Sequence, residues 1–161
     1  MSLAVGDRIP DVPVAISGGD GMPKQTQTGE LLGSGKVVLF AVPGAFTPGC
    51  SNYHLPGFVT LADQLKEKGV DTIACIAVND AFVMHAWGAD QNVGDAVVMI
   101  ADGNGDFARA ADLEFDGSGI GLGLRSQRYA AVLRDGVVEQ LFVESAPGVD
   151  VSGADNVLKN L

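Results

Sequence analysis

The residues with the clearest chemical potential lie in one short segment, positions 43 to 50, which reads PGAFTPGC. It ends in a cysteine, Cys50, directly before an apolar pattern with helical spacing. A helix N-terminus offers free N–H groups and the positive end of the helix dipole. A cysteine placed there can be held as a thiolate, which is the nucleophilic form of the side chain. The segment therefore predicts a nucleophilic cysteine.

A thiolate at this position needs help from a cation. A free cysteine is only a few per cent ionised at neutral pH, and a helix terminus stabilises an anion by only about 0.3 to 2 kcal/mol. The sequence offers Arg125 and Arg128, which lie at the mouth of a predicted hairpin strand. A guanidinium group stays charged when partly buried and presents several donors to an oxyanion. Thr47, three residues before Cys50, can place its hydroxyl beside the sulfur as donor and acceptor.

The elements that must position these residues alternate between strands and helices. Apolar runs at 36–42, 71–78 and 97–101 predict strands, and the first two read as strands buried on both faces of a sheet. Apolar positions from Ser51 onward follow helical spacing, and Asp80 can cap a second helix. One side of that second helix is predicted to carry Phe82, Val83, Ala86 and Trp87.

The second half of the chain predicts an antiparallel addition to this sheet. Runs at 128–133 and 137–143 flank a hairpin signal at Arg134, Asp135 and Gly136. A further strand is possible at 12–16, and Ser152 or Asp155 could start a last helix. We expect one α/β domain over residues 1–161, with a mixed central sheet and helices on both faces.

Composition limits the partners. Twenty acidic and ten basic residues in 161 give a net charge of −10, which repels phosphate backbones and anionic lipids. We therefore expect no nucleic acid and no membrane partner, and no apolar run is long enough to span a bilayer. We expect no secretory signal, and the two cysteines favour a reducing, cytoplasmic location. Neither a metal site nor a cofactor is expected, and His54 and His85 are given surface or capping roles.

Three stretches carry a resemblance to a known family. PGAFTPGC followed by SNYHLPGF covers 43–58, VNDAFVMHAWG covers 78–88, and LRSQRYA covers 124–130. The chain resembles the peroxiredoxins of the AhpC/TSA-redoxin superfamily, and within them the type II, peroxiredoxin 5-like subfamily. The resemblance implies a thioredoxin-like fold with an N-terminal extension, and a peroxidase that reduces hydrogen peroxide and organic hydroperoxides.

The resemblance also implies a role for each site residue. Cys50 matches the peroxidatic cysteine, Thr47 the threonine that positions the peroxide, and Pro43 the proline that shields the sulfur. The catalytic arginine of the family precedes an aromatic residue, which makes it Arg128 here, with Arg125 as a secondary support. The thiolate would attack the peroxide and become a sulfenic acid, in keeping with antioxidant defence and redox homeostasis.

The sequence departs from some members of the family because it has no resolving cysteine after Cys75, and Cys75 itself reads as a core residue of a buried strand. We therefore expect recycling by an external thiol, either glutathione with glutaredoxin or thioredoxin. The resemblance further implies a homodimer. Pro56 cannot donate a backbone hydrogen bond and should weaken the turn that bears Cys50.

The sequence leaves two other functions open. A dithiol–disulfide oxidoreductase of the same fold would need a C-x-x-C motif, which residues 51–53 after Cys50 do not complete. A non-catalytic thioredoxin-like binding or chaperone module would need no reactive sulfur at all.

Overall fold

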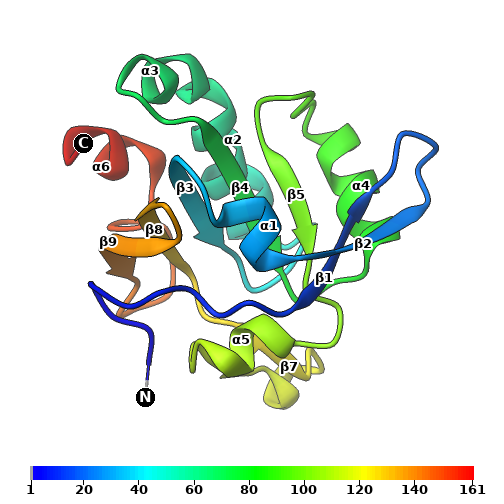
Figure 1. Cartoon of the computed structure of the whole chain (residues 1–161). Coiled ribbons are helices and arrows are strands. Elements are labelled where there is room, and N and C mark those ends of the chain that lie inside the picture. The colour runs from blue at the N-terminus through cyan, green and yellow to red at the C-terminus, as the bar shows by residue number, and fades with distance from the viewer. Residues whose placement is uncertain (1) are drawn as a thin grey trace.

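The computed structural model describes residues 2–161 and is built around a mixed seven-stranded sheet (Figure 1). The strand order is β2-β1-β5-β4-β3-β8-β9. β3, β4 and β5 run parallel to one another, whereas the outer strands join antiparallel. The strands of this sheet are β1 (Pro13–Ser17), β2 (Pro23–Gln27), β3 (Lys36–Ala41), β4 (Thr72–Ala77), β5 (Val98–Ala101), β8 (Tyr129–Arg134) and β9 (Val137–Val143).

Helices cover both faces of the sheet, as the alternating pattern predicts (Figure 1). One buried cluster joins the sheet to α2, α4 and α6, and a second joins its other face to α1 and α5. A separate two-stranded sheet, β6 with β7, lies outside the main sheet. The remaining elements are α1 (Thr28–Leu32), the π-helix η1 (Cys50–His54), α2 (Leu55–Thr60), α3 (Ala62–Glu67), α4 (Ala81–Asp90), α5 (Asp106–Ala110), β6 (Glu114–Asp116), the 3-10 helix η2 (Ser118–Ile120), β7 (Leu124–Ser126) and α6 (Ala154–Lys159).

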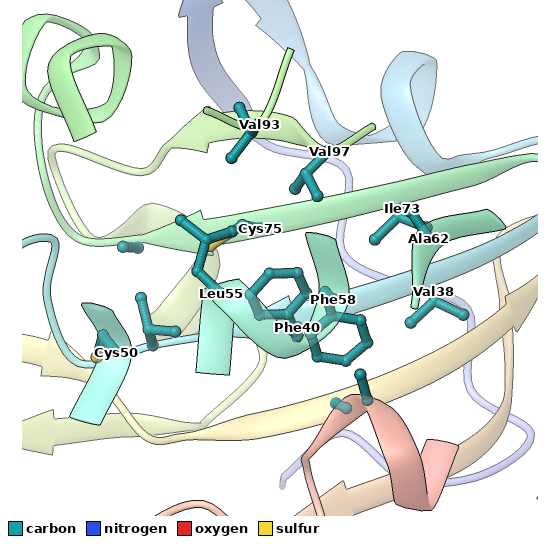
Figure 2. Packing of buried hydrophobic residues seen from close by; sticks show 14 of the residues in the cluster. Val38, Phe40, Cys50, Leu55, Phe58, Ala62, Ile73, Cys75, Val93 and Val97 are labelled. Carbon is teal, nitrogen blue, oxygen red and sulfur yellow. The ribbon is translucent and has the colours of Figure 1, made fainter. Parts of the chain in front are cut away.

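The central strands are apolar because both of their faces are covered. All of β3 and β4 except the first residue of each is buried. On the face that carries the site, the ring of Phe40 stacks on Phe58 of α2 with centroids 4.0 Å apart. Figure 2 shows Cys50 at one end of this cluster, with Val38 toward the other. The core therefore reaches directly under the turn that bears Cys50.

The structure confirms the central strands, the hairpin and the cap predicted from sequence. Asp135 and Gly136 have φ angles of 49° and 81°, and positive φ angles at both central residues are what a favoured two-residue hairpin turn requires. The Asp80 carboxylate accepts a hydrogen bond from the Val83 amide at 2.8 Å and caps α4. Within residues 2–161, no helix is long and apolar enough to cross a membrane.

One predicted helix face is wrong. Phe82 is 55% exposed, and Ala86 is also exposed, whereas Met84 and Trp87 point into the core. α4 is apolar on most sides, so its sequence does not say which side faces the sheet.

Candidate active site

The segment PGAFTPGC leaves the carboxyl end of β3 and leads into a helix that begins at Pro48, three residues before the predicted start. The loop is tied down on both sides. The Ala45 amide donates to Asn79 Oδ1 at 2.9 Å, which joins the loop to the end of the neighbouring strand β4. The Thr47 hydroxyl donates to the Gly44 carbonyl at 2.7 Å. Cys50 is the third residue of this helix, so its amide N–H has no partner earlier in the helix.

The turn that bears Cys50 is a π-helix, and Pro56 supplies a physical reason. The Leu55 amide donates to the Cys50 carbonyl five residues earlier. The next residue, Pro56, has no N–H with which to continue the α-helical pattern. The π-helical turn therefore lies where Pro56 was predicted to weaken the helix.

Antiparallel pairing of β3 with β8 brings Arg128 to the cysteine. Ala41, at the end of β3, lies opposite Tyr129, so Arg128 sits at the mouth of the loop. Its Nη2 donates to Cys50 Sγ at 3.2 Å. The Cys50 residue is fully buried, which the sequence did not indicate for this position. The structure thus confirms that Cys50 and Arg128 meet.

The two glycines of the loop make room for the two arginines. A Cβ on Gly49 would lie 3.2 Å from Arg128 Nη2, and a Cβ on Gly44 would lie 2.8 Å from Arg125 Nη1. Arg125 donates through Nε to the Leu122 carbonyl at 3.0 Å and through Nη1 to the Pro43 carbonyl at 3.4 Å. Arg125 therefore holds the loop in place, and the hydrogen bond to the sulfur comes from Arg128.

His54 is a site residue that the sequence interpretation missed. Instead of lying at the surface or capping a helix, it is fully buried between two partners. Its Nδ1 lies 2.9 Å from Arg128 Nη1, and its Nε2 lies 2.9 Å from the Ser152 carbonyl. Because Arg128 can only donate and the carbonyl can only accept, the proton of the neutral ring must be on Nε2. Burial, followed by the charge of Arg128, lowers the pKa of His54 from 6.5 to about 4.

Two further contacts surround the reactive turn. Trp87 of α4 is fully buried, as predicted, and its Nε1 also donates to Ser51 Oγ at 2.9 Å. Cys75 lies in β4, fully buried and free, so it is the core residue that the sequence predicted. Burial, and then the neighbouring Cys50, raise the pKa of the Cys75 thiol, which keeps it protonated.

A cavity of about 520 Å³ opens beside the site. Pro43 and Arg128 form part of its wall, together with the apolar residues Phe115 and Pro147. The acidic residues Glu114, Asp116 and Glu144 also line it. The structure thus places a buried sulfur, a cation bonded to it, and an adjoining space at the carboxyl end of β3.

Comparison with known proteins gives a consistent result. A model of the redoxin family matches residues 4–158. The chain is 44% identical to peroxiredoxin-2B of Arabidopsis thaliana, over 99% of this chain and 98% of that one. A reduced Prx3 of Vibrio vulnificus, solved in complex with H2O2, superposes with a TM-score of 0.93 at 48% identity, covering 98% of both chains. Peroxiredoxin 5 of Alvinella pompejana gives a TM-score of 0.86 at 38% identity, over 98% and 96% of the two chains.

Proposed function

The chain belongs to the redoxin family and is a peroxiredoxin, a peroxidase with the thioredoxin-like fold, and on that premise we propose that Cys50 is its peroxidatic residue. One observation carries the proposal: the Arg128 guanidinium donates to Cys50 Sγ at 3.2 Å. A cation bonded to the sulfur favours the thiolate, which is the form that attacks a peroxide.

The reaction proceeds in one displacement. The Cys50 thiolate attacks the terminal oxygen of ROOH, and the S–O bond forms as the O–O bond breaks. The leaving hydroxide or alkoxide takes up a proton from solvent to become water or an alcohol. Arg128 and the Cys50 amide N–H donate to the charge that develops on the leaving oxygen. Cys50 is left as a sulfenic acid.

Thr47 acts as an acceptor in this scheme. Its hydroxyl proton is directed to the Gly44 carbonyl, which leaves the oxygen lone pairs free to accept the peroxide O–H. This contact would orient the peroxide, and Pro43 would shield the sulfur from water. The sequence allowed Thr47 to be donor or acceptor, and the Gly44 contact favours acceptor.

The proposed substrates are hydrogen peroxide and organic hydroperoxides. The cavity beside Arg128 exceeds what hydrogen peroxide needs, and Phe115 and Pro147 give it an apolar wall for an organic substituent. A structural relative from Vibrio vulnificus, described as bound to H2O2, supports the smaller substrate.

An external thiol completes the proposed cycle. Cys50 and Cys75 are the only cysteines of the sequence, and Cys75 is buried in β4 with a raised pKa. The sulfenic acid would therefore condense with glutathione or a thioredoxin cysteine, release water, and be freed by a second thiol. Glutathione with glutaredoxin and thioredoxin are both candidates.

The proposal includes a homodimer in a reducing compartment such as the cytoplasm. Phe46, Phe82 and Ile120 are 52%, 55% and 75% exposed, and apolar side chains of this size favour a protein partner. Both cysteines are free, which suits a reducing environment.

Steady-state peroxide consumption tests the proposed function. The wild-type protein, Cys50→Ser and the matched control Cys75→Ala are each assayed with a glutathione–glutaredoxin system and with a thioredoxin system. We expect turnover with at least one system in the wild type and in C75A, and none in C50S. Equal turnover in C50S and wild type would contradict the role of Cys50, and the faster system identifies the reductant.

A further inference from the structure

A single carboxylate oxygen organises the segment that follows β9. Glu144 Oε2 accepts hydrogen bonds from the Asp150 amide at 2.8 Å, the Ser152 amide at 2.8 Å and the Ser152 hydroxyl at 2.5 Å. Ser152 is fully buried. None of the ion pairs within residues 2–161 involves Glu144, so its charge is directed at this loop. The carboxylate therefore fixes the position of the Ser152 backbone.

The Ser152 backbone in turn contacts the active site. Its carbonyl accepts the Nε2 proton of His54, and His54 Nδ1 accepts from Arg128 Nη1. Arg128 then donates through its other terminal nitrogen to Cys50 Sγ. An unbroken series of hydrogen bonds thus runs from Glu144 to the sulfur.

Glu144 is also anchored to Arg128 through the main chain. Its amide donates to the Arg128 carbonyl at 3.0 Å, beyond the end of the β8–β9 ladder. The two residues are therefore linked at the backbone and a second time through Ser152 and His54.

We propose that Glu144 is a positioning residue of the peroxidatic centre: it holds the Ser152 carbonyl where His54 must donate to it, and so keeps His54 as the acceptor that fixes Arg128 on Cys50. The inference rests on the proposed function, and it adds a residue that lies just after β9 and forms no hydrogen bond with the sulfur or with the Arg128 side chain. Without Glu144, the Ser152 carbonyl is free to move, and His54 loses the partner that sets its tautomer.

The direction in which the Cys50 thiolate fraction changes distinguishes a positioning role of Glu144 from a purely electrostatic one. Removing a carboxylate near a thiol would by itself stabilise the thiolate, because a negative charge is lost. Loss of positioning has the opposite result, since Arg128 would leave the sulfur and the thiolate would become less favourable. The thiolate fraction at neutral pH therefore reports which role Glu144 has.

The test uses the full-length reduced protein and two readouts. One is the rate of Cys50 oxidation by excess hydrogen peroxide, followed by stopped-flow fluorescence of Trp87. The other is the thiolate fraction at neutral pH, followed by ultraviolet absorbance, which needs no peroxide. Glu144→Ala is compared with wild type and with the control Glu139→Ala. Glu139 lies in β9, and Glu144 directly follows that strand, so the control removes an exposed carboxylate from the same part of the chain.

We expect E144A to react on the order of ten-fold more slowly and to hold a smaller thiolate fraction, because small displacements of a catalytic group are costly. E139A should match wild type in both readouts. A wild-type rate in E144A, or an increased thiolate fraction, would overturn the proposal. If E144A does not fold, Glu144→Gln replaces it with an expected several-fold decrease, and a wild-type rate in that variant also overturns the proposal.

A double-mutant cycle tests the route through His54. If Glu144 acts through His54, then E144A combined with His54→Phe, which removes the contacts to both Ser152 and Arg128, should react at the rate of H54F alone. Independent effects, in which E144A slows H54F as much as it slows wild type, would contradict the proposed route. Failure of the wild type to react with peroxide would instead contradict the proposed function, and the thiolate readout would still test the positioning.

Discussion

The buried imidazole of His54 should make the stability of the protein fall in a defined acidic range. Burial and the adjacent Arg128 hold the pKa of His54 at about 4, against an ordinary value of 6.5. Above pH 6.5 the ring is neutral in both the folded and the unfolded chain. As the pH falls from 6.5 toward 4, the unfolded chain takes up a proton that the folded chain refuses, so unfolding becomes more favourable.

The size of this effect follows from the change in pKa. A fall from 6.5 to about 4 corresponds to about 3 kcal/mol of unfolding free energy, which is fully present above pH 6.5 and lost by pH 4. This is a large part of the roughly 5 to 15 kcal/mol that stabilises an ordinary domain. Glu144, the other charged group near His54, should stay ionised over most of this range: burial raises its pKa, but hydrogen bonds from Ser152 and Asp150 outweigh that effect and leave it below 4.5.

The assay is urea unfolding between pH 7.5 and 4.5, followed by the fluorescence of the single tryptophan, Trp87. His54→Gln keeps a donor for Ser152 and an acceptor for Arg128 but does not titrate. Wild type should therefore lose stability relative to H54Q as the pH falls, whereas the exposed control His85→Gln should follow wild type. Parallel loss of stability in wild type and H54Q would refute the reasoning.

Three substitutions test the geometry around the sulfur. Arg128→Lys should slow peroxide reduction about a hundred-fold, because an ammonium group cannot hold both His54 and the sulfur as a planar fork does; a wild-type rate in stopped-flow measurements would argue against it. Gly49→Ala should slow the same reaction by roughly several-fold, since the new Cβ would lie 3.2 Å from Arg128 Nη2, and an unchanged rate would show that the loop yields freely. Ser51→Ala should lower the unfolding free energy by about 1 kcal/mol through loss of the Trp87 contact, and urea denaturation that finds no change would exclude a stabilising role for it.

The parts of the fold that could be predicted are those with a strong local signal. β3 and β4 are continuous apolar runs because both faces are covered, and Asp135 with Gly136 specifies the hairpin turn. β2, with the sequence PKQTQ, carries no apolar alternation because it is an edge strand, so nothing in its sequence indicated pairing with β1. The position of α4 was predicted correctly, but the side that faces the sheet was not, since apolar residues lie on most sides of this helix.

In the site, too, the residues with a strong local signal could be predicted and the others could not. A cysteine at a helix start and an arginine at a strand start could be paired from sequence, because their roles are visible in short motifs. The role of His54 could not, since its partner Ser152 lies 98 residues further along the chain and presents a backbone carbonyl, which has no side-chain signature. The three bonds to Glu144 escaped prediction for the same reason: two of their donors are backbone amides.

The most direct test of the account is a single turnover of the reduced protein with one equivalent of hydrogen peroxide, followed by peptide mass analysis. The account predicts that the mass of one oxygen atom appears on the peptide that contains Cys50, at a rate on the order of a hundred-fold or more above that of free cysteine, and that Arg128→Lys removes most of that advantage. Oxygen found on Cys75, or oxidation of Cys50 no faster than that of free cysteine, would contradict the claim that this sulfur, bonded to Arg128, is the group that reduces the peroxide.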